Sequence, residues 1–262
     1  MARLTRPGIR LFWREDGPQA GPALLFLNSL GTDLRLWDGV VARLQDTYRC
    51  IRMDTRGHGE TGAPDGGPYD MAMLTEDAAA ILDHLGLARV TPVGVSLGGM
   101  MAQNLAATRP KTVTRAVFSN TAPRMGSAQL WADRISAVRA GGIERIADAI
   151  LDRWFAPEAR HGPDMDHWRA MLTATPAQGY AGCCAALAAA DLGAQIARIT
   201  CPALVVAGAH DGASPPAQVK SFADSLANAR YEEMGGVGHL PMAEAPDRFA
   251  ALVRHFLETT HD

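Results

Sequence analysis

The chain has 262 residues, of which 47% are hydrophobic, and this suits one large α/β domain or two smaller ones. The formal net charge of −3 offers no excess of positive charge, so nucleic acid is not an expected partner. No apolar run approaches the roughly 18 residues of a membrane span, and the N-terminus lacks the apolar stretch of a signal peptide. We therefore expect a cytoplasmic protein that does not bind membranes.

The four cysteines also favour a cytoplasmic location. They form no CxxC pair, and the neighbours Cys183 and Cys184 are poorly placed to form a disulfide with each other. A reduced protein without a zinc site is therefore expected.

Short apolar runs alternate with longer amphipathic stretches along the chain. The predicted strands cover residues 9–15, 23–28, 48–54, 90–95, 115–120, 203–208 and 229–234. The predicted helices include residues 75–86, 97–109, 216–227 and 246–259. Nearly continuous apolar strands are typical of a sheet that is covered on both faces. The alternation predicts an α/β fold with a doubly wound, mainly parallel sheet.

From about residue 123 to residue 192 this alternation stops. The segment contains only amphipathic helical patterns, such as residues 128–140 and 180–192. It is too long for an ordinary crossover between two strands. We predict that residues 123–192 form an inserted helical cap, and that residues 1–122 and 193–262 form the core.

One serine lies in a setting that favours catalysis. The stretch GVSLG, residues 94–98, matches the pattern G-x-S-x-G, and it follows a predicted strand and opens a predicted helix. A sharp turn of this kind strains the backbone of Ser96, and the flanking glycines leave room for it. The helix N-terminus also directs free N–H groups toward the hydroxyl. The alternative is that Ser96 has no catalytic role and is a small residue that fills a tight turn.

A serine hydroxyl is a weak nucleophile and needs an oriented base. Among the eight histidines, His239 is the best candidate, because it follows the last predicted strand on a glycine-rich loop. His58 lies in a turn-rich loop and is more simply structural. The orienting carboxylate is expected at the same sheet edge, where Asp211 follows a predicted strand; its alternative role is a helix N-cap. The order Ser96, Asp211, His239 is the one that a triad on such a sheet requires.

An acyl-transfer site also needs hydrogen-bond donors for the oxyanion. One predicted donor is the backbone N–H of Leu97, directly after the serine. The second is the backbone N–H of Leu30, in the loop that follows the strand at 23–28. The side chains of Asn28 and Ser29 either brace this loop or serve its turn.

Seven stretches carry a family resemblance: FLNSLGTDLRLWD, RMDTRGHGETGAP, VGVSLGGMMAQ, VFSNTAPRMGSAQLWADR, GYAGCCAALAAADL, AGAHDGASPP and GGVGHLPMAEAP. Together they span nearly the whole chain and resemble the α/β-hydrolase superfamily. The less widely shared stretches NSLGTD, SNTAPRMG and GYAGCCAAL resemble the 3-oxoadipate enol-lactone hydrolases of the β-ketoadipate pathway of aromatic degradation. The resemblance carries the triad onto Ser96, Asp211 and His239, and the oxyanion donors onto Leu30 and Leu97. It implies no metal and no organic cofactor.

The implied reaction is hydrolysis of 3-oxoadipate enol-lactone to 3-oxoadipate through an acyl-enzyme. The partner is a small-molecule lactone or ester, and self-association is left open. Trp131 and Arg134, in the first helix of the predicted cap, are candidates for binding the substrate carboxylate. The alternatives are that Arg134 is a solvated residue on the helix surface, and that Trp131, like Trp154 and Trp168, packs in the core or between the cap and the sheet, which is the default interpretation for all three tryptophans.

Other functions share the same motifs. A carboxylesterase, a carbon–carbon bond hydrolase and a cofactor-free perhydrolase would carry the same triad. A protein that binds a ligand without turnover is the alternative from another class.

Overall fold

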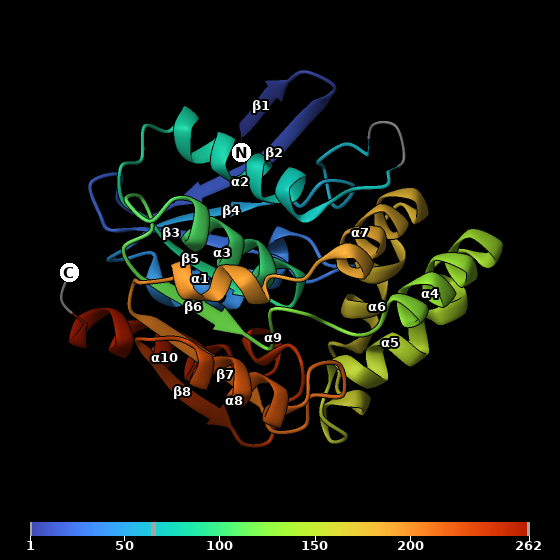
Figure 1. Ribbon diagram of the computed structural model, residues 1–262. Coiled ribbons are helices and arrows are strands. Elements are labelled where there is room, and N and C mark those ends of the chain that lie inside the picture. The colour runs from blue at the N-terminus through green and yellow to red at the C-terminus, as the bar shows by residue number, and fades with distance from the viewer. Residues whose placement is uncertain (1, 64–66, 261–262) are drawn as a thin grey trace.

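The computed structural model describes residues 2–63 and 67–260. Within these ranges the strands are β1 (Ala2–Arg6), β2 (Ile9–Asp16), β3 (Ala23–Leu27), β4 (Arg49–Met53), β5 (Thr91–Val95), β6 (Ala116–Ser119), β7 (Ala203–Gly208) and β8 (Ala229–Met234). They form one sheet in the order β1-β2-β4-β3-β5-β6-β7-β8 (Figure 1). β2 is antiparallel to both of its neighbours, and the pairs from β4 to β8 are parallel. The predicted doubly wound, mainly parallel α/β fold is confirmed.

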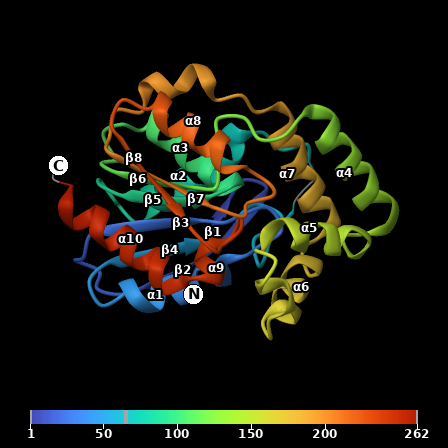
Figure 2. The same cartoon turned by 90° about the horizontal axis from the view of Figure 1, so that it is seen from below.

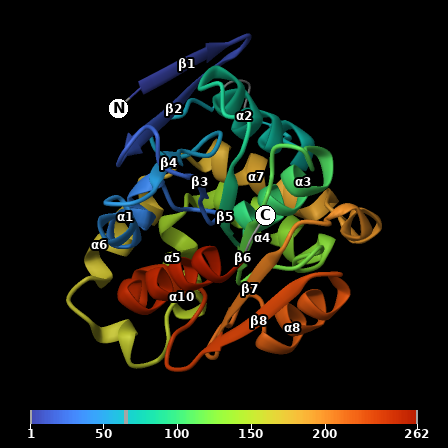
Figure 3. The same cartoon turned by 90° about the vertical axis from the view of Figure 1, so that its left-hand side faces the viewer.

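The α-helices of the described ranges are α1 (Asp38–Leu44), α2 (Met71–His84), α3 (Leu97–Thr108), α4 (Ala128–Gly141), α5 (Ala147–Trp154), α6 (Met165–Thr173), α7 (Ala177–Ala189), α8 (Pro216–Ser225), α9 (Pro241–Glu244) and α10 (Pro246–Thr259). Figure 2 shows α1, α9 and α10 on one face of the sheet and α2, α3 and α8 on the other, and Figure 3 shows the same division for α1 and α10 against α2, α3 and α8. None of these helices is both long and apolar enough to cross a membrane.

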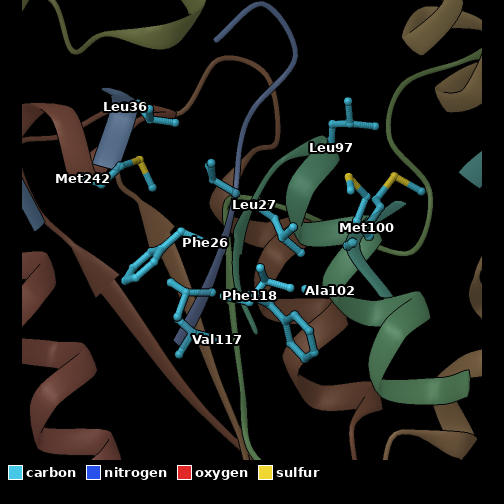
Figure 4. Packing of buried hydrophobic residues seen from close by; sticks show 14 of the residues in the cluster. Phe26, Leu27, Leu36, Leu97, Met100, Ala102, Val117, Phe118 and Met242 are labelled. Carbon is cyan, nitrogen blue, oxygen red and sulfur yellow. The ribbon is translucent and has the colours of Figure 1, made fainter. Parts of the chain in front are cut away.

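Side chains of the central strands fill both interfaces between sheet and helices. Figure 4 shows Phe26 of β3 on the side of Leu36 and Met242, whereas Phe118 of β6 points toward α3. The Phe118 ring lies 5.5 Å from the ring of Phe222 in α8. Burying each such side chain stabilises the fold by roughly 1.5–3 kcal/mol. This two-sided burial explains why the central strands are apolar throughout.

Two elements differ from the prediction. β1 was missed because ARLTR carries only two apolar residues; it is an edge strand whose side chains alternate between half-buried and exposed. α2 begins at Met71, four residues before the predicted start, because Asp70 caps it: the Asp70 carboxylate accepts a hydrogen bond from the Met73 N–H at 2.7 Å.

Between β6 and β7 the described chain forms helices and no strand, as predicted. α4 to α7 lie together beside the sheet (Figure 1). Trp131 of α4 and Tyr180 of α7 are buried in the same hydrophobic cluster as the strands. Trp154 is also buried, and Trp168 packs against the cluster. The boundaries of a separate cap, at residues 123 and 192, stay a prediction.

Candidate active site

Ser96 occupies a strained turn between β5 and α3. Its φ of 56° and ψ of −117° are rare for a residue with a side chain. β6 and the loop after it hold this backbone, because the Ser96 N–H donates to the Ser119 carbonyl at 3.0 Å and the Ser96 carbonyl accepts from the Thr121 hydroxyl at 2.9 Å. A Cβ at Gly94 would lie only 2.2 Å from the Gly98 carbonyl oxygen. The turn therefore requires a glycine at position 94.

Asp211 follows β7 and His239 follows β8, and the structure brings them into direct contact. The His239 Nδ1 lies 2.8 Å from the Asp211 Oδ2, and both residues are buried. Because an ionised carboxylate can only accept, Nδ1 is the donor, and Nε2 is left to accept a proton. The His239 N–H also donates to the Trp154 carbonyl at 2.8 Å. The histidine is therefore fixed through both its ring and its backbone.

The Asp211 carboxylate is held in its ionised form. Its oxygens accept hydrogen bonds from the Ser214 hydroxyl at 2.5 Å, the Asn120 amide at 2.8 Å and the Ala213 N–H at 2.7 Å. Burial opposes ionisation, but the interactions with His239, Ser214 and Asn120 prevail and lower the pKa of Asp211. Since α8 begins at Pro216, Asp211 is not its N-cap residue.

Asn120 is a supporting residue that the sequence did not reveal. It directly follows β6 and has a φ of 49°, and its side-chain amide donates to Asp211 and, at 3.3 Å, to the Gly238 carbonyl next to His239. Its own side-chain oxygen accepts from the Ser119 hydroxyl at 2.7 Å. The residue thus joins the two loops that carry the acid and the base.

Two variants separate the roles of Asn120. Both Asn120→Gly and Asn120→Ala remove the hydrogen bond to Asp211. We therefore expect both to lower kcat by tenfold or more with little change in KM, since the lost charge-assisted bond of ~1.5–3 kcal/mol corresponds to at most about 10- to 150-fold. Alanine tolerates the positive φ less well than glycine, at a cost of about 1–2 kcal/mol. Steady-state kinetics and thermal melts should therefore show equal kcat losses and a lower Tm for alanine. Wild-type kcat in both variants would contradict the supporting role.

A cavity connects the serine with the acid–base pair. Ser96, His239 and Leu30 line it from the core, and Trp131 and Arg134 line it from α4. Ser96 and His239 therefore meet at one cavity, and Asp211 is linked to it through its hydrogen bond with His239. The predicted carboxylate-binding residues face the same space.

The predicted oxyanion donors lie on the two segments that flank the serine. Leu97 is the first residue of α3, and the Leu30 loop is tied to that helix because the Gly98 N–H donates to the Asn28 carbonyl at 2.9 Å. Among the residues that the structure describes, no acceptor pairs with the N–H of Leu30 or of Leu97. Both groups are therefore free to donate to a ligand. The Asn28 amide braces the loop by donating to the Met53 carbonyl at 2.7 Å.

The cap side of the cavity carries two arginines. The Arg134 guanidinium lies 5.1 Å from the centre of the Trp131 ring, and Trp131 itself is anchored by its indole N–H, which donates to the Met125 carbonyl at 2.7 Å. Arg153 of α5 lines the same cavity and was not predicted. Within residues 2–63 and 67–260, neither arginine forms an ion pair with a carboxylate. Two cations are therefore available to an anionic ligand.

The comparisons with known proteins agree with this architecture. The alpha/beta hydrolase family model matches residues 24–252. The chain is 37% identical over 248 residues to 3-oxoadipate enol-lactonase 2 of Acinetobacter baylyi, which covers 94% of this chain and 92% of that protein. Its structure matches the enol-lactonase from Burkholderia xenovorans with a TM-score of 0.95 and 38% identity, covering 98% and 100% of the two chains. It also matches a thermophilic esterase from Thermogutta terrifontis with a TM-score of 0.93 and 26% identity, covering both chains fully.

The chain belongs to the alpha/beta hydrolase family. Within that family it is a homologue of enol-lactonases, and the resemblance seen in the sequence is confirmed.

Proposed function

We propose that this protein hydrolyses 3-oxoadipate enol-lactone to 3-oxoadipate, with Ser96 as nucleophile, His239 as base and Asp211 as orienting acid. The observation that carries the proposal is a strained serine that shares one cavity with a buried, hydrogen-bonded histidine–aspartate pair. The enol-lactonase homologues, at 37% and 38% identity over nearly full length, support this choice of substrate. The proposed partner is thus a small lactone, and the proposed setting is aromatic catabolism in the cytoplasm.

Acylation begins at the serine. His239 accepts the proton of the Ser96 hydroxyl through Nε2 while the serine oxygen attacks the lactone carbonyl. Asp211, whose pKa is held low, stabilises the imidazolium that forms. The N–H groups of Leu30 and Leu97 donate to the oxyanion of the tetrahedral intermediate.

Ring opening and deacylation complete the reaction. The C–O bond of the ring breaks, His239 returns its proton to the leaving enol oxygen, and the enol becomes a ketone. Water then loses a proton to His239 and attacks the ester of Ser96. His239 passes that proton to the Ser96 oxygen as it leaves, and the released carboxyl group loses its remaining proton to solvent to become the second carboxylate of the product. Each atom of the lactone and of one water molecule is accounted for.

The substrate carries one carboxylate away from the scissile carbonyl, and the two cap arginines supply a place for it. Arg134 is half-buried and is oriented by Trp131, whereas Arg153 is exposed at the rim of the same cavity. A guanidinium binds a carboxylate through two parallel hydrogen bonds, so orientation is fixed as well as charge.

Replacing either arginine should separate charged from neutral substrates. We expect Arg134→Ala and Arg153→Ala each to raise KM for the carboxylated lactone by about 10- to 150-fold, from the loss of a charged hydrogen bond of ~1.5–3 kcal/mol. KM for the neutral enol-lactone with methyl in place of carboxymethyl should not change. Arg139→Ala, an exposed arginine of α4 outside the cavity lining, is the matched control. Equal effects on both lactones would remove these arginines from the site.

The proposed activity is tested by product analysis. Purified protein is incubated with the enol-lactone, and the appearance of 3-oxoadipate is followed by mass spectrometry beside Ser96→Ala and an aryl ester. Formation of 3-oxoadipate only with intact Ser96 supports the proposal. Turnover of the aryl ester without the lactone would favour a carboxylesterase, and no turnover with no labelling of Ser96 by a phosphonate would favour a binding protein.

A further inference from the structure

The loop that carries Leu30 is fixed at the peptide groups on both sides of that residue. On one side, the Ser29 carbonyl accepts from the Thr32 N–H at 3.2 Å and from the Thr32 hydroxyl at 2.9 Å. In a trans peptide the C=O and N–H groups point in opposite directions, so these bonds aim the Leu30 N–H away from Thr32. On the other side, the Gly31 N–H donates to the His58 Nε2 at 2.9 Å.

The partners of His58 define its protonation state. Its Nδ1 lies 3.2 Å from the Arg56 carbonyl, which can only accept, so Nδ1 carries the proton. Its Nε2 receives the Gly31 N–H and must therefore be unprotonated. The ring is fully buried. The hydrogen bond to Gly31 exists only while His58 is neutral and in this tautomer.

The loop around His58 is itself firmly built. The His58 N–H donates to the Thr55 carbonyl at 2.8 Å. The buried Asp54 carboxylate accepts from the Glu60 N–H and from the Leu34 N–H, both at 2.8 Å. The turn after β4 therefore holds the Leu30 loop at two amides, one through Asp54 and one through His58.

We infer that His58 is a positioning residue for the proposed oxyanion hole: by accepting the Gly31 N–H, its neutral ring fixes the Leu30–Gly31 peptide, and this keeps the loop from turning the Leu30 N–H away from the direction that Thr32 sets. This inference rests on the proposed role of Leu30. Gly31 has a φ of 81°, and a Cβ there would lie 2.6 Å from Leu172 Cδ1, so the loop has little room to find another arrangement. Without the acceptor, the Gly31 N–H would be left unpaired in a buried place, and the peptide would turn to find a partner.

Burial lowers the pKa of His58 to about 4. The hydrogen bond to the Arg56 carbonyl and the charge of Asp33 work against the effect of burial but do not outweigh it. The ring of His58 therefore stays neutral at neutral pH.

The test uses variants that remove or keep the acceptor. His58→Phe retains a ring without nitrogen, and His58→Gln keeps an acceptor near the position of Nε2. His84→Phe, at an exposed histidine of α2, is the matched control. For each protein, kcat and KM are measured on a neutral aryl ester, together with the affinities of a trifluoromethyl ketone, which forms an oxyanion adduct with the serine, and of adipate, which binds without covalent chemistry.

We expect His58→Phe to lower kcat by roughly 10- to 100-fold, at or below the ~10²–10³ that the loss of one oxyanion donor costs. Trifluoromethyl ketone affinity should fall by a similar factor, while KM and adipate affinity stay unchanged and His58→Gln recovers most of kcat. A folded His58→Phe with wild-type kcat would overturn the inference, as would equal losses for adipate and the ketone. If wild type itself neither hydrolyses the ester nor reacts with a phosphonate at Ser96, the proposed function fails instead.

A measurement on the wild type does not depend on how the variants fold. Long-range ¹H–¹⁵N correlation spectra assign the protonated ring nitrogen. We expect a proton on Nδ1 at neutral pH, and an amide shift of Gly31 that follows the titration of His58. A proton on Nε2 would overturn the inference, because the Gly31 N–H would then have no acceptor there.

Discussion

Replacing Ser96 with alanine is expected to lower kcat on the enol-lactone by about 10⁴- to 10⁶-fold, as in other triads, where the residual rate comes from binding and the oxyanion hole. The fold should not change, because the hydrogen bonds of Ser96 to β6 and the loop after it run through its backbone. Alanine has a Cβ as serine does, so the strain of a backbone φ of 56° is the same in the variant and in the wild type. The Tm should therefore stay close to the wild-type value.

The experiment combines single-turnover kinetics with thermal melts and a binding assay for adipate. Ser221→Ala, at an exposed serine of α8, is the matched control for the loss of one hydroxyl. Turnover by Ser96→Ala within tenfold of wild type, in a protein shown to be free of wild-type contamination, would contradict the assignment of the nucleophile.

Asp211→Asn is the second large effect, with an expected loss in kcat on the order of 10⁴. The carboxylate accepts from His239, Ser214 and Asn120 together with two backbone N–H groups, so all of its neighbours are donors. An asparagine must turn an NH₂ toward one of them. If it faces His239, the ring proton moves to Nε2, and the base can no longer accept the serine proton.

The pH profile of this variant adds a second readout. If the imidazole is locked in the wrong tautomer, kcat should recover in part at high pH, as deprotonated serine no longer needs the base. Asp224→Asn, at an exposed carboxylate of α8, is the matched control and should behave like wild type. A loss below tenfold in Asp211→Asn would mean that another carboxylate orients His239.

Much of the fold could be predicted because burial on both faces of a sheet leaves a continuous apolar pattern. All seven predicted strands are present, with ends that differ by at most one residue. β1 could not be recognised, because an edge strand with two apolar residues has no pattern that distinguishes it from a loop. The start of α2 depends on the cap at Asp70, a single side chain that the apolar periodicity does not report.

The positions of the candidate triad could be predicted because local motifs at strand ends share one edge of a parallel sheet. The residues that surround the candidate triad could not be predicted from the sequence. Asn120 and Asp211 are 91 positions apart in the sequence, and they come together only because β6 and β7 are paired in the sheet. Arg153 lies on an amphipathic helix, where nothing in the sequence separates a cavity residue from a solvated one. The contact of His58 with Gly31 joins two different loops, so the sequence around His58 does not report it.

The most direct test of the central claim compares two lactones with the same ring and the same leaving group. kcat/KM is measured for 3-oxoadipate enol-lactone and for its neutral analogue with methyl in place of carboxymethyl. We predict a value at least 10-fold larger for the carboxylated lactone, because even one charged hydrogen bond of ~1.5–3 kcal/mol at Arg134 or Arg153 corresponds to about 10- to 150-fold. An equal or larger value for the neutral lactone would contradict the proposed substrate, although the Ser96 chemistry would stand.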